Sequence, residues 1–321
     1  MSVFNTKFKI AQINFNLYSD FDASDMILDI QPYNLNVNYY LDSQFISNQT
    51  VNIYIKHNDS KLKIVEEFEE SISSYYIEGD YNPMFKEGYN KQFGLFGNKG
   101  IVNRIILHSL EKAGDIILHG CAAINFKKKK VILGIGSSGS GKSVLTSAAI
   151  ECGWRIVGTE HIIIGSDLTL YKGNSTDNAS IQSINIIKSQ LEKAVVFDDK
   201  IMTEPTTQKV VVDYKAYMIE QQSVSLSDFE LNLVIVSFKS SICSEFVEIK
   251  DSDFLLRMIQ ISASEKICTP IIYDDYMLDQ KLNGKPKNRV NIINLLIKGS
   301  KFNVVFGGDY SSFIRALKSL V

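Results

Sequence analysis

Eight consecutive residues near the middle of the chain have the types and spacing of a phosphate-binding loop. They read Gly-Ser-Ser-Gly-Ser-Gly-Lys-Ser and fit the pattern G-x-x-x-x-G-K-S. In this pattern the glycines let several backbone N–H groups point at one phosphate, the lysine reaches the β- and γ-phosphates, and the serine hydroxyl coordinates Mg²⁺. The sequence therefore predicts a nucleoside triphosphate site made by Gly136, Ser137, Ser138, Gly139, Ser140, Gly141, Lys142, Ser143 and Val144.

The residues on either side of the loop fit its expected place between a strand and a helix. The run from Val131 to Ile135 is short, apolar and rich in β-branched residues, which predicts a buried strand. The run from Ser143 to Ile150 has helical character, so the positive end of that helix would add to the anion cradle. A run of glycine and serine can also be a flexible turn, but this strand and helix favour phosphate binding.

A phosphate loop alone does not separate a kinase from a GTPase or a motor, so the acid that accompanies Mg²⁺ matters. Most proteins with this loop take that acid from a distant strand that ends in Asp. Here the best such strand, Leu231 to Phe238, ends in Ser and Phe, whereas Glu160 lies 18 residues after Lys142, where we expect the next strand to end. A carboxylate at a strand end can also be merely solvated. No Asn-Lys-x-Asp segment for guanine recognition is present, which favours ATP over GTP.

A histidine-glycine pair, the loop, and the segment that follows the loop's helix form a wider pattern. The pair is His119-Gly120, and the segment from Gly153 to Glu160 reads Gly-Trp-Arg-Ile-Val-Gly-Thr-Glu. Together they resemble the HPr kinase/phosphorylase family and, more loosely, the ATP-dependent phosphoenolpyruvate carboxykinases. The resemblance spans Leu118 to Ile164. It implies an α/β fold with a P-loop nucleotide-binding core of the HPr kinase/PEP carboxykinase type.

The resemblance also implies roles for individual residues. The family has two adjacent acids after the loop's helix; Thr159 falls on the first position and Glu160 on the second, so one charge is missing. Glu160 takes the role of general base and metal neighbour. His119 would orient the acids, although a histidine at the end of an apolar run is as often a hydrogen-bonded structural residue. The predicted catalytic residues are Glu160, Lys142 and His119, and the predicted metal ligands are Ser143 and Glu160.

The function that the resemblance implies is that of an ATP- and Mg²⁺-dependent kinase that transfers the γ-phosphate to a hydroxyl. The expected acceptor is a Ser or Thr of a peptide or small protein. Three alternatives stay open: a small-molecule hydroxyl as acceptor, a nucleotide-dependent binding or regulatory module with weak ATPase activity, and a phosphorylase that reverses the reaction. Members of the family often form symmetric homo-oligomers, so a homo-oligomer is compatible with the resemblance.

Composition and charge narrow the class of protein and its partners. The 321 residues are 45% hydrophobic and 22% charged, as is ordinary for globular chains. A net charge of −2 gives no general attraction to nucleic acid or to an anionic membrane. With no apolar stretch near the ~20 residues that cross a bilayer and no signal-peptide core, we expect a cytoplasmic protein. Four cysteines without a C-x-x-C pair predict reduced thiols: Cys121, Cys152, Cys243 and Cys268.

The hydrophobic pattern changes near residue 96. Residues 1–95 alternate between apolar and polar, which predicts a β-rich, antiparallel N-terminal domain. Residues 96–321 alternate strands with helices, as expected for the kinase domain. A polar stretch from 166 to 210 reads as a long loop, a candidate for substrate binding. The other elements predicted are helices over 101–112, 142–152 and 251–264 and strands over 116–124, 130–135, 155–157, 162–164 and 231–238.

Overall fold

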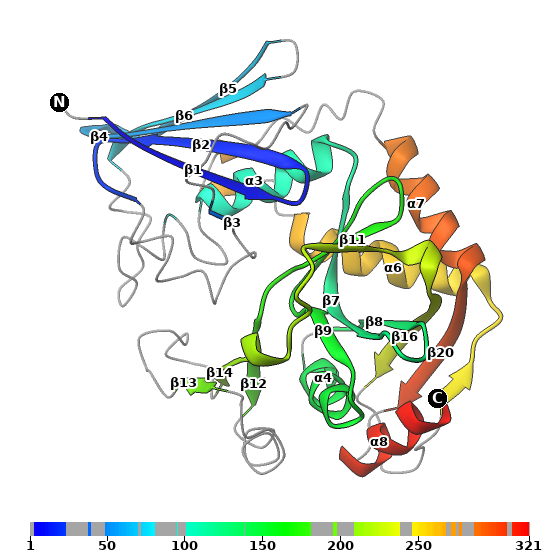
Figure 1. Ribbon diagram of the computed structural model, residues 1–321. Coiled ribbons are helices and arrows are strands. Elements are labelled where there is room, and N and C mark those ends of the chain that lie inside the picture. The colour runs from blue at the N-terminus through cyan, green and yellow to red at the C-terminus, as the bar shows by residue number, and fades with distance from the viewer. Residues whose placement is uncertain are drawn as a thin grey trace. The chain divides into compact units, whose positions relative to one another are not determined.

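The chain is mixed α/β and rich in strands, and it divides into two units (Figure 1). Met1–Ala113 and Ile267–Asn283 form the first unit, and Gly114–Lys266 and Gly284–Val321 form the second. This division differs from the predicted boundary at residue 96, because the helix over 101–112 groups with the first unit. The computed structural model describes residues 3–23, 38–39, 49–69, 72–80, 95, 101–137, 139–180, 195–197, 209–237, 246–267, 271–273, 276–277, 286–306 and 310–320.

Alternation of apolar and polar residues builds the main sheet of the first unit. Its strands lie in the order β3 (Asn38–Tyr39), β1 (Phe4–Ile10), β2 (Ile13–Ser19), β4 (Thr50–Lys61), β6 (Ile72–Asp80) and β5 (Lys63–Glu69). In β2, Ile13, Phe15 and Leu17 are buried and the residues between them are half-buried. Strand β4 pairs parallel with both β2 and β6, so the sheet is mixed and the antiparallel prediction is wrong in part. Parallel neighbours need long connections, and 30 residues separate β2 from β4.

Helix α3 (Ile101–Lys112) begins and ends where the sequence predicts. The Lys112 ammonium bonds to the carboxylate of Glu66 on β5, which also accepts a hydrogen bond of 2.9 Å from the Tyr75 hydroxyl on β6. The Tyr75 ring also lies edge-on to His108 of α3. These contacts join α3 to the sheet and explain why it belongs to the first unit. This unit also contains β18 (Ile271–Tyr273) and β19 (Tyr276–Met277).

The second unit is built on a nine-stranded sheet whose central strands are buried. The order is β15 (Ser223–Ser225), β11 (Thr169–Tyr171), β10 (His161–Ile164), β7 (Ile116–Asn125), β8 (Lys130–Ile135), β16 (Glu230–Ser237), β20 (Ser300–Phe306) and β17 (Phe246–Glu248), and β9 (Arg155–Gly158) also pairs with β7. Strands β8, β16 and β20 are parallel. Their carboxyl ends therefore meet at one edge of the sheet, where open α/β sheets bind ligands.

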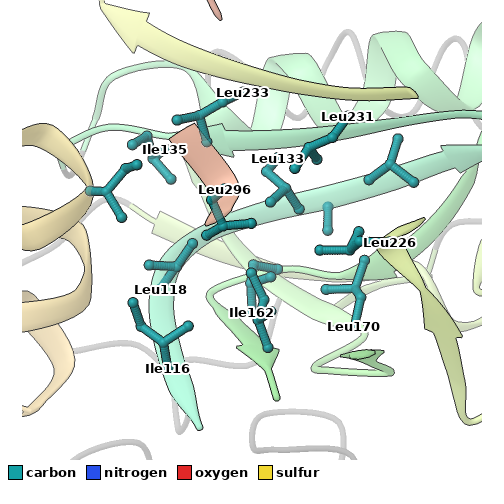
Figure 2. Close-up of a cluster of buried hydrophobic side chains, with 14 of the residues drawn as sticks. Ile116, Leu118, Leu133, Ile135, Ile162, Leu170, Leu226, Leu231, Leu233 and Leu296 are labelled. Carbon is teal, nitrogen blue, oxygen red and sulfur yellow. The ribbon is translucent and has the colours of Figure 1, made fainter. Parts of the chain in front are cut away.

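Helices cover both faces of this sheet. They are α4 (Lys142–Glu151) and α8 (Tyr310–Ser319) on one face, and α6 (Ser252–Ile267) and α7 (Pro286–Gly299) on the other. Successive strand residues point to opposite faces, so Ile132 packs with α4 and α8, and Leu133 packs with α6 and α7. Figure 2 shows the hydrophobic cluster on the face covered by α6 and α7, with Leu133 and Leu233 beside Leu296 of α7. Within the described ranges, no helix is long and apolar enough to cross a membrane.

The elements around the predicted phosphate loop agree with the sequence prediction. Strand β8 has the predicted bounds, and α4 ends one residue earlier than predicted. The loop predicted from 166 to 210 is wrong in part, because this stretch contains β11 and most of a small sheet. The strands of that sheet are β12 (Thr176–Ser180), β14 (Lys209–Asp213) and β13 (Val195–Phe197). Residues 181–194 and 198–208 lie outside the described part of the chain.

Candidate active site

The predicted phosphate loop connects the end of β8 to the start of α4. Gly139 and Gly141 have φ angles of 78° and 103°, in the left-handed region that favours glycine. Gly141 also caps the N-terminus of α4, where the first N–H groups of the helix have no partner within it. The backbone thus turns as a phosphate cradle requires. Ser138 lies outside the described residues.

Gly136 is held tightly where the loop leaves β8. A Cβ atom there would lie 2.5 Å from the carbonyl oxygen of Val236 on β16 and 2.6 Å from Ser140 Oγ, so only glycine fits without a shift. Ser140 is 3% exposed, and its hydroxyl has no hydrogen-bond partner in the described part of the chain. A buried hydroxyl without a partner is costly unless a ligand completes it. This orphan donor and the close loop fit an anion such as a nucleotide phosphate.

The lysine and serine that end the phosphate-binding pattern are the first two residues of α4. Lys142 Nζ donates to the carbonyl oxygens of Gly136 at 2.9 Å and Ser137 at 3.0 Å, so its ammonium folds over the loop. Val144 packs against the hydrophobic cluster under α4. It can therefore offer a nucleotide its backbone N–H but not its side chain.

Glu160 lies between β9 and β10, close to the start of the loop. The Gly120 N–H donates to the Glu160 carbonyl oxygen at 3.4 Å, and Gly120 pairs with Ile135, the last residue of β8. Glu160 has a φ of 54°, a strained value for a residue other than glycine. His119 Nε2 lies 3.2 Å from Glu160 Oε2, and both side chains are largely buried. The structure thus brings together His119, Glu160 and the base of the loop, as the prediction requires.

Thr159 stands where the resemblance would place the first of the two adjacent acids. It is 1% exposed, and its hydroxyl donates to the carbonyl oxygen of Thr176 and lies 3.3 Å from that of Asn174. The Thr159 N–H also donates to the Asn174 carbonyl oxygen at 3.0 Å. Thr159 therefore adds no charge to the site. It fixes the chain that enters β12.

Asp177, on β12, is an acid of this site that the sequence prediction missed. It is 8% exposed and interacts with Glu160, Ser143 and Lys142. Burial raises the pKa of its carboxyl from 3.8 to about 6, and the charge of Glu160 adds to this effect. A hydrogen bond with Ser143 and the charge of Lys142 act in the opposite direction but are outweighed. The site therefore has two neighbouring carboxylates, from β12 and from the β9–β10 junction.

No local signal marked Asp177 in the sequence. Strand β12 reads Thr-Asp-Asn-Ala-Ser, which has neither apolar alternation nor β-branched enrichment. In the sequence, 28 residues separate β12 from its partner β14. The position of Asp177 is therefore set by pairing with distant residues, which include Val212 opposite it.

Other residues of this region are structural. His161 is 1% exposed, and its Nδ1 lies 3.1 Å from Asn174 Oδ1. Cys121 lies under α4 with its sulfur 3.9 Å from the Lys142 carbonyl oxygen, and burial raises the pKa of its thiol to about 11. It is therefore protonated at neutral pH. Cys152 is half-buried and free; Cys243 and Cys268 lie outside the described residues.

Three oxygen donors lie where a metal ion would accompany a bound nucleotide. They are the Ser143 hydroxyl and the carboxylates of Asp177 and Glu160, and such hard ligands suit Mg²⁺. Among the described residues, no group of three or more His, Cys, Asp and Glu side chains could hold a metal ion by itself. Mg²⁺ in nucleotide sites is held by one or two carboxylates together with phosphates. The residues therefore fit Mg²⁺ bound with a nucleotide.

No protein-family model matches the chain, and no curated protein sequence matches it.

Proposed function

We propose that the chain is an ATP- and Mg²⁺-dependent kinase, built on a P-loop core of the HPr kinase/PEP carboxykinase type, that phosphorylates a hydroxyl. One observation carries the proposal. Glu160, whose carboxylate is largely buried, accepts a hydrogen bond at its backbone carbonyl from Gly120, and Gly120 pairs with Ile135 at the end of β8, just before the phosphate loop. A protein that only binds nucleotide needs no base beside the phosphates, whereas a kinase does.

The residues of the site divide the work of phosphoryl transfer. The loop N–H groups and the positive end of α4 bind the phosphates, and the Lys142 ammonium offsets their charge. Mg²⁺, when bound, neutralises charge at the transferred group. Glu160 accepts the proton of the acceptor hydroxyl as its oxygen bonds to the γ-phosphorus, while the bond from phosphorus to the ADP oxygen breaks. His119 holds the Glu160 carboxylate in position.

The proposed acceptor rests on the resemblance to the HPr kinase/phosphorylase family. This resemblance favours a Ser or Thr of a peptide or small protein, and Glu160 could act in the same way on the hydroxyl of a small molecule. ATP is favoured as donor because the sequence has no guanine-reading segment. A nucleotide-dependent regulatory module is the competing function, and a transfer assay separates it from a kinase.

The test uses γ-labelled ATP, Mg²⁺, an array of Ser- and Thr-containing peptides, and a pool of hydroxylated metabolites. We expect transfer by the wild type, a loss of about 10²- to 10⁴-fold in Glu160→Gln at unchanged ATP affinity, and loss of nucleotide binding in Lys142→Ala. Lys128→Ala is the matched control, because Lys128 lies in the exposed turn before β8.

Two results would contradict these assignments. Transfer to none of these acceptors, together with ATP binding that depends on Lys142, would favour the regulatory module. Full transfer by Glu160→Gln would show that Glu160 is not the base.

A further inference from the structure

Asp177 contacts the one loop hydroxyl that is expected to bind the metal ion. We propose that Asp177, acting with Ser143, holds the Mg²⁺ of the bound nucleotide, and that Glu160 is thereby left to serve as the base. This inference rests on the proposed function, and it divides between two residues the two roles that the sequence assigned to Glu160 alone.

The first argument is the place that Asp177 takes. In P-loop proteins, Mg²⁺ is held by the loop Ser or Thr and by an Asp from another strand. The parallel neighbour of β8 is β16, whose Val236 passes over Gly136, but β16 ends at Ser237 without an acid. Asp177 reaches the Ser143 hydroxyl from β12 instead. Asp177 therefore takes the role of the Mg²⁺-binding acid, but it comes from β12 instead of β16.

The second argument is the way Asp177 is held. The neighbouring Thr176 carbonyl accepts a hydrogen bond from Thr159, and the Ser175 carbonyl accepts one of 2.9 Å from the Tyr214 N–H. Asp177 also pairs with Val212 across the small sheet. Thr159 is therefore a positioning residue, because its hydroxyl fixes the backbone next to the proposed metal ligand.

The third argument is charge. Asp177 and Glu160 are neighbouring, largely buried carboxylates, and Lys142 is the cation that acts on Asp177. A divalent cation held by Asp177 and Ser143 would offset the negative charge of this carboxylate pair. The Ser140 hydroxyl of the phosphate loop is buried and has no partner in the described part of the chain. It could donate a hydrogen bond to a phosphate oxygen.

The test measures how much Mg²⁺ strengthens binding of a fluorescent ADP analogue, methylanthraniloyl-ADP, compared with binding in EDTA. In Asp177→Asn we expect the Mg²⁺-dependent affinity to fall by at least about 10- to 100-fold, the loss seen when even a supporting partner of a metal ligand is removed. Affinity in EDTA should stay equal or increase, because a negative charge near the phosphates is removed. Asp213→Asn is the matched control. Asp213 is also 8% exposed and pairs with Thr176. Its carboxylate, however, accepts a hydrogen bond from the Lys215 backbone N–H and is not part of the site.

The outcomes separate the inference from the proposed function. A full Mg²⁺ effect in Asp177→Asn overturns the inference and leaves the kinase proposal standing. If the wild type does not bind the analogue with or without Mg²⁺, the proposed function itself fails. An equal loss of the Mg²⁺ effect in Glu160→Gln would overturn the division of roles.

A second measurement on the wild type covers the case in which the variant does not fold. Fe²⁺ replaces Mg²⁺ in the presence of ADP, and ascorbate and peroxide then cleave the backbone near the metal. We expect cuts at β12 around Asp177 and at the start of α4 around Ser143. Cuts near Glu160 without cuts in β12 would overturn the inference.

Discussion

Replacing Asp177 with Asn should stabilise the protein in the absence of metal and nucleotide. The Asp177 carboxyl is buried beside Glu160, and burial raises its pKa from 3.8 to about 6. At neutral pH the folded protein must therefore hold a charged group that its surroundings disfavour. Asn has the shape of the protonated carboxyl. It can accept from Ser143 and donate to Glu160, but it never ionises.

The size of the effect follows from the two pKa values. Between pH 4 and pH 6, the folded chain binds more protons at Asp177 than the unfolded chain, so wild-type stability falls as pH rises through this window. A difference of about two pKa units corresponds to about 3 kcal/mol. The stability advantage of Asp177→Asn should thus be near zero below pH 4 and reach about 3 kcal/mol above pH 7. For a unit of this size, that is a rise in Tm of roughly 6 to 12 °C.

The assay is urea unfolding or thermal unfolding of both proteins from pH 4 to pH 8, in EDTA. The other titrating groups are common to both chains, so the difference between the two curves reports Asp177 together with its interaction with Glu160. The reasoning is refuted if Asp177→Asn is less stable at neutral pH, or if its advantage does not change between pH 4 and pH 7. Addition of Mg²⁺ and ADP should reduce the advantage, because ligand binding stabilises the wild type more than the variant.

Two further substitutions test the loop and the support of Asp177. Gly136→Ala should weaken binding of methylanthraniloyl-ADP at least about 10-fold, because the new Cβ would clash with a backbone oxygen 2.5 Å away and displace the loop. Gly153→Ala is the control: Gly153 has a left-handed φ and open space around it, so this variant should lose about 1 kcal/mol of stability and bind the analogue unchanged. Thr159→Val should lower stability by about 1–3 kcal/mol by removing the bond to the Thr176 carbonyl and should reduce the Mg²⁺ effect on ADP binding, whereas Thr159→Ser should retain both. Equal binding by both glycine variants, or equal behaviour of the Val and Ser variants, would contradict these explanations.

The parts of the site that the sequence predicted are those with local causes. Glycines in the left-handed region, an apolar β-branched strand and a short helix are written in consecutive residues from β8 to α4, and the structure places them as predicted. Glu160 was found through its spacing from Lys142 and through the resemblance. The structure then explained its location by the bond from Gly120.

The parts that could not be predicted depend on distant pairing. Strand β12 has a polar sequence that reads as a loop, and only its pairing with β14 makes it a strand. The same cause produced the error in the first unit, where β4 pairs parallel with β2 across a long connection. The hydrophobic pattern of a strand shows whether one of its faces is buried, but it does not show which other strand pairs with it.

The presence of a threonine at position 159 and of an acid on β12 has a structural reason. Position 159 is almost fully buried and faces the carbonyl oxygens of Asn174 and Thr176, so a hydroxyl that donates is satisfied there, whereas a carboxylate would meet two acceptors. The Thr159 hydroxyl instead bonds to the Thr176 carbonyl, and this bond holds β12 where Asp177 reaches Ser143. It follows that the proposed metal site forms only when β12 is docked, which ties Mg²⁺ binding to the small sheet as well as to the phosphate loop.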